Sequence, residues 1–139
     1  MALPEATDLT SLVLRTAFGD DAAWEALRAA IDACAEGHAT YVSDPAFDGA
    51  DVQALVDADA AAGEDDKSCY LFLADAVATT GGEHLLLAVD LYDEPGRTFR
   101  VAPRSFADVS ANLSIANMDF ADYADAVDAS GVFRGFDGG

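Results

Sequence analysis

Cys69-Tyr70-Leu71-Phe72-Leu73-Ala74 is a run of strand length that is apolar at both odd and even positions. A strand with apolar side chains on both faces belongs inside a sheet that is covered on both sides, as in α/β proteins. Leu12-Val13-Leu14, followed by Arg15-Thr16, shows the same pattern. These two segments predict two central strands of a sheet flanked by helices.

The segment between the two predicted strands carries helix, turn and strand signals. Gly19-Asp20-Asp21 is typical of a turn and a helix N-cap, and Gly37 of a helix stop. The apolar residues between them recur at helical spacing: Trp24, Leu27, Ile31 and Cys34. A short strand over Ala39–Ser43, ending in the turn Asp44-Pro45, and a weaker helix over Asp51–Ala61 are predicted to follow.

The second half of the chain predicts a hairpin and then two helices. Strands over Leu85–Tyr92 and Thr98–Val101 flank Glu94-Pro95-Gly96-Arg97, in which proline and glycine suit the central positions of a type II turn. Ser105 with Asp108 three residues later resembles a capping box that opens a helix. A last helix is expected from an N-cap at Asp119 to Gly131, and the apolar tail Val132–Phe136 is expected to pack back on the domain.

These elements predict one α/β domain over residues 1–139. Right-handed crossovers place strands one and three side by side in parallel, with strand two outside strand one. We therefore predict a five-stranded mixed sheet in the order 2-1-3-4-5, in which the last strands form an antiparallel meander and helices flank the sheet.

The charge excludes some classes of partner. The chain has 26 acidic and 7 basic residues, a formal net charge of −19. Nucleic acids and anionic membranes bind basic faces, so we expect neither as a partner. A basic protein is compatible with this charge, although a GC-rich genome or salt adaptation would explain the acidity equally well. No secretion signal or membrane span is recognisable, which predicts a cytoplasmic protein.

Two cysteines, Cys34 and Cys69, lie within apolar patterns and lack Cys-x-x-Cys spacing. We interpret both as reduced thiols in the core. A zinc site would need two more ligands, and the spacing of His38 and His84 does not supply them. We find no catalytic motif and expect no cofactor.

Carboxylates follow the predicted parallel strands. Asp20 comes after strand one, Asp44 ends strand two and Asp75 ends strand three. Because ligands of open α/β sheets bind at the carboxyl ends of the strands, these three residues are candidate Mg²⁺ ligands. The simpler interpretation is that they cap helices and turns.

Two further groups are candidate binding residues. Asp119, Asp122, Asp125 and Asp128 recur every third residue of the last predicted helix, as a stripe that would dock a basic partner or a solvated helix face. Arg97 and Arg100 would hold a small anionic ligand, unless they pair with nearby carboxylates at the surface.

Five segments of the sequence are similar to a known family: Leu12–Trp24, Asp44–Gly49, Asp90–Val101, Asn112–Phe120 and Gly131–Phe136. Together they resemble an uncharacterised family of small actinobacterial proteins, catalogued only as a domain of unknown function. The resemblance covers nearly the whole chain, implies no activity, and favours the GC-rich explanation of the acidity.

Two functions of different classes follow from these features. The first is a small acidic, non-enzymatic protein-binding module, similar in charge to immunity or regulatory proteins that bind basic partners. The alternative is a metal- or small-ligand-binding domain that uses the carboxylates at the strand ends. A structural or oligomerisation role stays open, and the sequence does not predict the oligomeric state.

Overall fold

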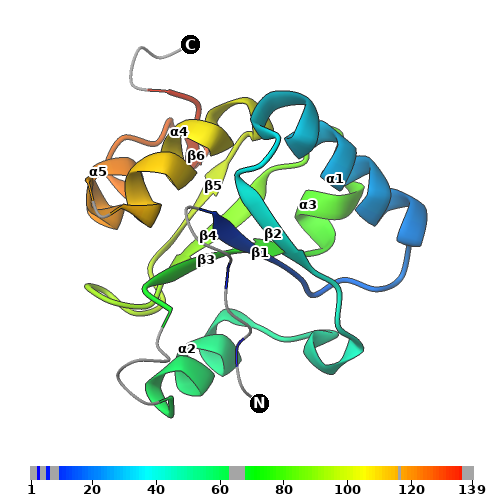
Figure 1. Ribbon diagram of the computed structural model, residues 1–139, viewed down its shortest axis with the longest axis horizontal. Coiled ribbons are helices and arrows are strands. Elements are labelled where there is room, and N and C mark those ends of the chain that lie inside the picture. Colours follow the sequence, from blue (N-terminus) through cyan, green and yellow to red (C-terminus); the bar gives the residue numbers. More distant parts are fainter. Residues whose placement is uncertain (1–2, 4–5, 7–9, 63–67, 116, 136–139) are drawn as a thin grey trace.

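A computed structural model describes residues 3, 6, 10–62, 68–115 and 117–135. Its centre is a mixed sheet of six strands in the order β2-β1-β3-β4-β5-β6, shown in Figure 1. β1 is parallel to β2 and β3, β4 is antiparallel to β3 and β5, and β6 is parallel to β5. The strands are β1 Ser11–Arg15, β2 Ala39–Val42, β3 Tyr70–Ala74, β4 Leu86–Asp90, β5 Thr98–Val101 and β6 Val132–Phe133.

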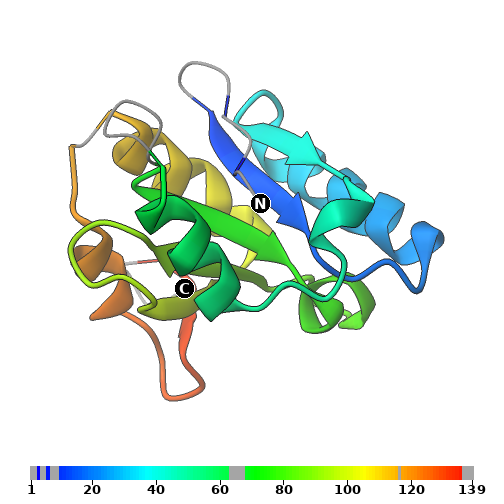
Figure 2. The same cartoon turned by 90° about the horizontal axis from the view of Figure 1, so that it is seen from below.

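Helices cover both faces of the sheet (Figures 1 and 2). Four of them, with the apolar residues Trp24, Ala78, Phe106 and Tyr123, pack on one face, and α2, with Leu55, packs on the other. The helices are α1 Asp21–Ala35, α2 Val52–Ala60, α3 Ala76–Thr80, α4 Pro103–Ser114 and α5 Phe120–Ala124, with a short 3-10 helix η1 at Pro45–Phe47.

The two segments that predicted central strands are buried on both faces. In β1, Val13 faces the core under α1, while Leu12 and Leu14 face the core over α2. In β3, Phe72 and Leu73 divide between the two cores in the same way. The α/β class and the predicted order of the first five strands are confirmed.

The prediction of five strands was wrong, because the chain after α5 adds a sixth. The N–H of Arg100 donates to the carbonyl of Gly131 at 3.0 Å, and β6 continues this pairing along β5. β6 has only two residues, too few for a strand pattern to stand out in the sequence. The expected packing of the tail is confirmed for Val132 and Phe133, which are buried, whereas Phe136 lies outside the described residues.

Two helix starts differ from the prediction. α4 begins at Pro103 with Ala102 as its N-cap, so Ser105 lies inside the helix and opens no capping box. Proline suits the first helical position because it has no N–H that would need a partner. α3 was not predicted, since the sequence after Asp75 reads as a turn. Its N-cap is Asp75, whose Oδ1 accepts the N–H of Ala78 at 3.0 Å.

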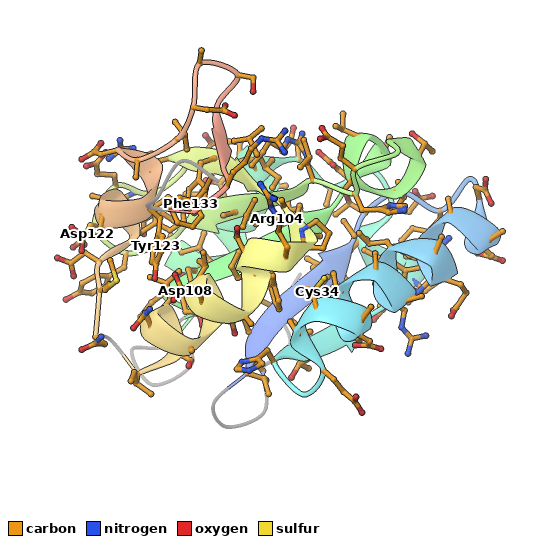
Figure 3. All side chains as sticks on the ribbon, turned by 90° about the horizontal axis from the view of Figure 1, so that it is seen from above. Cys34, Arg104, Asp108, Asp122, Tyr123 and Phe133 are labelled. Carbon is orange, nitrogen blue, oxygen red and sulfur yellow. The ribbon has the colours of Figure 1, made fainter. Side chains whose placement is uncertain are left out.

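Both cysteines are exposed, which corrects their interpretation as core thiols. Leu27, Ile31 and Ala35, spaced four residues apart, form the buried face of α1. Cys34, which is labelled on α1 in Figure 3, lies outside this buried face and is exposed. Cys69 directly precedes β3 and is not part of it.

Candidate protein-binding surface

The tip of the β4–β5 hairpin is organised by one buried carboxylate. Asp90 is 2% exposed, and its two oxygens accept the N–H groups of Tyr92 and Glu94, each at 2.9 Å. The carbonyl of Asp90 also accepts the N–H of Gly96 at 2.8 Å. The predicted type II turn is confirmed, since Gly96 has φ +96° and the N–H of Arg97 donates to the carbonyl of Glu94.

Arg97 connects this hairpin to α5. Its Nη1 contacts Glu94 Oε1 at 3.4 Å, and its Nη2 donates to Asp125, directly after α5. The hairpin and α5 lie at the same end of the molecule in Figures 1 and 2. One guanidinium thus holds together two acidic segments that are 28 residues apart.

α5 is held in place by its aromatic side chains. Tyr123 is fully buried, and its ring lies 4.9 Å from that of Phe133 in β6. Phe120 lies 4.9 Å from Phe99 in β5. Burial raises the pKa of Tyr123, whose hydroxyl accepts a hydrogen bond from Asn112 Nδ2 at 2.9 Å. With these rings facing the core, Asp122 lies at the outer edge of the molecule, as Figure 3 shows.

The four aspartates predicted as one helical stripe do not form one. α5 ends at Ala124, so Asp125 is its C-cap and Asp128 lies beyond it. Asp119 and Asp122 are exposed at the start of α5, where the N–H of Asp119 donates to Asp122 Oδ2 at 2.9 Å. The expected N-cap at Asp119 is confirmed.

Asp128 organises the turn that ends the helical segment. Its Oδ1 accepts the hydroxyl and the N–H of Ser130 and the N–H of Val132, while Oδ2 accepts from Arg134 Nε at 3.1 Å. The hydrogen bond from the Ser130 side chain, followed by that from Val132, lowers the pKa of Asp128 to about 2. These bonds hold the turn that leads into β6, after α5 has ended at Ala124.

The candidate metal ligands are not brought together. Each caps a helix of its own, and no group of three His, Cys, Asp or Glu side chains placed to hold a metal occurs in the described part of the chain. Asp20 Oδ1 accepts the N–H of Ala23, Asp44 Oδ1 that of Ala46 and Asp75 Oδ1 that of Ala78.

Arg97 and Arg100 do not share a binding site either. Because side chains alternate along a strand, Arg97 lies on the Phe99 face of β5 and Arg100 on the opposite face. Arg100 binds Asp75 through two hydrogen bonds of 2.8 Å. Both arginines instead fit the alternative interpretation, in which they pair with carboxylates of the same chain.

One further arginine was not singled out from the sequence. Arg15 ends β1 and is 4% exposed, with its Nη2 2.8 Å from Asp21 Oδ1 and its guanidinium 4.4 Å from the centre of the Phe18 ring. The feature of the sequence that could have indicated Arg15 is its position, since it is a charged residue at the end of an apolar strand. Five arginines therefore form ion pairs within the described chain: Arg15, Arg28, Arg97, Arg100 and Arg134.

The model of one protein family, described as a domain of unknown function (DUF6924), matches residues 10–136. The chain belongs to the DUF6924 family. The predicted resemblance to a domain of unknown function is thereby confirmed, and every element from β1 to β6 of this DUF6924 domain lies within the match. The search of curated proteins found no match. Among the described residues of the domain, no helix has the length and apolar character needed to cross a membrane.

Proposed function

We propose that this DUF6924 domain is a non-enzymatic protein-binding module that recognises a basic protein. Its binding surface in this proposal is the acidic end, which comprises exposed carboxylates of the β4–β5 hairpin and of the α5 segment. The acidic end consists of Asp93, Glu94, Asp119, Asp122 and Asp125.

The observation that supports the proposal is that arginines of the chain pair with its own carboxylates. In the described part of the chain, five arginines contact carboxylates of the same chain. The net charge of −19, which already includes these paired arginines, attracts a basic protein over distances of about a Debye length. At the acidic end, only Glu94 and Asp125 contact an arginine, Arg97, among the described residues.

The arrangement of the acidic end suits recognition of a protein surface. Arg97 links the hairpin to the end of α5, and the buried Tyr123 holds α5 on the core, so the two acidic segments are kept next to each other. Fixed charges steer association and select the orientation of a partner. We propose that this binding module acts in the cytoplasm as an immunity or regulatory protein, and that it is a protein of actinobacterial type.

The proposal is tested by capture from a lysate of the native host. The tagged domain is washed at about 0.15 M and about 0.5 M salt, since screening weakens binding by exposed charges. We expect a basic protein in near-stoichiometric amount that is lost or reduced at the higher salt. Absence of any bound basic protein after the wash at about 0.15 M salt contradicts the proposal.

A pair of matched variants locates the surface. Asp119→Asn/Asp122→Asn removes two charges from the acidic end, and asparagine is itself a good N-cap residue. Glu36→Gln/Asp48→Asn removes two charges from exposed positions outside it. We expect the first variant to weaken binding of the captured partner about tenfold and the second by less than about twofold. Equal losses would mean that net charge, and not the acidic end, determines binding.

A further inference from the structure

Tyr92 is an aromatic side chain that the fold leaves outside the core. Three large apolar side chains are exposed among the described residues: Val77 at 56%, Ile115 at 59% and Tyr92 at 72%. Single exposed apolar residues are common on protein surfaces, so exposure alone does not indicate a function. Tyr92 differs from the other two in its backbone support and in its charged neighbours.

The backbone of Tyr92 is fixed by a buried charge. Both oxygens of Asp90 are used to hold the N–H groups of Tyr92 and Glu94, although the Asp90 side chain is 2% exposed. Burial of a carboxylate is unfavourable unless hydrogen bonds compensate for the lost water. Its effect here is a hairpin tip with a fixed backbone at Tyr92, which lowers the backbone entropy lost when a partner binds.

The surroundings of the ring favour a cation. Asp93 is exposed, and Glu94 is 58% exposed and separated from Tyr92 by one residue. Other rings of the described chain already carry an arginine over their faces. Arg15 lies over Phe18 and Trp24, and Arg28 lies over Tyr41.

We propose that the ring of Tyr92 is the anchor of the acidic end and that an arginine or lysine side chain of the partner stacks on it. The negative face of an aromatic ring attracts a cation, and the adjacent carboxylates of Asp93 and Glu94 add to this attraction. Tyrosine and arginine are enriched among the few residues that carry most of the affinity in protein interfaces. The inference rests on the proposed function and names the residue and the partner chemistry within it.

The direct test uses a defined basic probe, an amidated, fluorescein-labelled octa-arginine peptide. Its binding to the wild-type domain, Tyr92→Ala, Tyr92→Phe and Ile115→Ala is followed by fluorescence anisotropy at about 0.05 M and 0.15 M salt. We expect Tyr92→Ala to weaken binding about fivefold, because one cation–aromatic contact contributes about 1 kcal/mol. Tyr92→Phe keeps the ring and Ile115→Ala removes an exposed apolar side chain elsewhere, so both should stay within about twofold of the wild type.

Two results overturn the inference: Tyr92→Ala binds the peptide as tightly as Tyr92→Phe, or Ile115→Ala loses as much affinity as Tyr92→Ala. Thermal melts of each variant check that the fold is intact, which we expect because Tyr92 is largely exposed. Capture from the host lysate distinguishes a failure of this inference from a failure of the proposed function. Undiminished capture by Tyr92→Ala contradicts the anchor alone, whereas failure of the wild type to capture any basic protein contradicts the binding module.

Discussion

Arg100 forms a two-point ion pair with Asp75: Nη1 donates to Oδ1 and Nη2 to Oδ2, each at 2.8 Å. The Arg100 and Asp75 side chains are 22% and 25% exposed, and Nη1 also donates to the carbonyl of Leu85 at 3.1 Å. The same carboxylate caps α3 through the N–H of Ala78. This pair joins β5, near one edge of the sheet, to the turn of helix that follows the central strand β3.

Removing the charge of Asp75 should destabilise the domain. Asp75→Asn keeps an acceptor for the N–H of Ala78 but leaves Arg100 without its counter-charge, so we expect a loss of about 2 kcal/mol. Urea denaturation of Asp75→Asn, Arg100→Lys and the double variant measures the coupling between the two residues. A loss of less than about 0.5 kcal/mol in Asp75→Asn would show that the pair is no more stabilising than an exposed one.

Magnesium should not stabilise the domain specifically. Asp20, Asp44 and Asp75 cap three separate helices and are not grouped for metal binding. We expect Mg²⁺ at millimolar concentration to raise the melting temperature no more than sodium chloride of equal ionic strength, because both screen the net charge of −19. A Mg²⁺-specific rise that is lost in Asp75→Asn would support the alternative function as a metal-binding domain.

Truncating Tyr123 should weaken the attachment of α5 and β6. Tyr123→Ala leaves a cavity beside Phe99 and Phe133, for which we expect a loss of about 4 kcal/mol. Tyr123→Phe keeps the ring and loses the hydrogen bonds of the hydroxyl, for which we expect a loss of about 1 kcal/mol. These bonds include that from Asn112 at 2.9 Å and those to the carbonyl of Asp108 and to Met118 Sδ. Urea denaturation gives both values. Equal effects would mean that the hydroxyl, and not the ring packing, holds α5 in place.

The stabilising effect of Asp128 should depend on pH. Its pKa falls from 3.8 to about 2 on folding, so the ionised form stabilises the folded state above about pH 4. This contribution is lost as the pH falls through about 2. We therefore expect the melting temperature of the wild type to exceed that of Asp128→Asn near pH 7, by a margin that shrinks between pH 4 and pH 2. A margin that does not change with pH, or an NMR titration of Asp128 near 3.8, contradicts this assignment.

Both thiols should react in the native state. Cys34 and Cys69 are exposed, so a disulfide reagent such as DTNB should modify both without denaturant. Partial burial, followed by the charges of Asp59, Asp90 and Asp93, raises the pKa of Cys69 above its usual value. In Cys34→Ser, the modification rate of Cys69 should therefore keep rising at high pH, and Asp93→Asn should shift that rise to lower pH. A rate profile unaffected by Asp93→Asn would exclude the charge effect.

The resemblance of sequence segments was sufficient to predict the family. The residues of the candidate site could not be predicted in the same way, because contacts between distant segments bring them together. Asp125 and Arg97 are separated by 28 positions, and only packing of the hairpin against α5 brings them together. The stripe from Asp119 to Asp128 was predicted from spacing alone, which assumes a continuous helix. In the structure α5 ends at Ala124. Asp128 holds a later turn through hydrogen bonds from Ser130 and Val132, which the pattern of side-chain polarity does not encode.

Local sequence by itself determined the α/β class, the buried strands β1 and β3, the type II turn at Pro95-Gly96 and the order of five strands. Each depends on side-chain polarity, backbone preference or chain handedness, which short segments carry. Only the tertiary structure decided the sixth strand, the exposure of Cys34 and Cys69, and the pairing of Arg97 and Arg100 with different carboxylates on opposite faces. These features depend on which residues meet across the sheet, and they are decided by the packing of the whole chain.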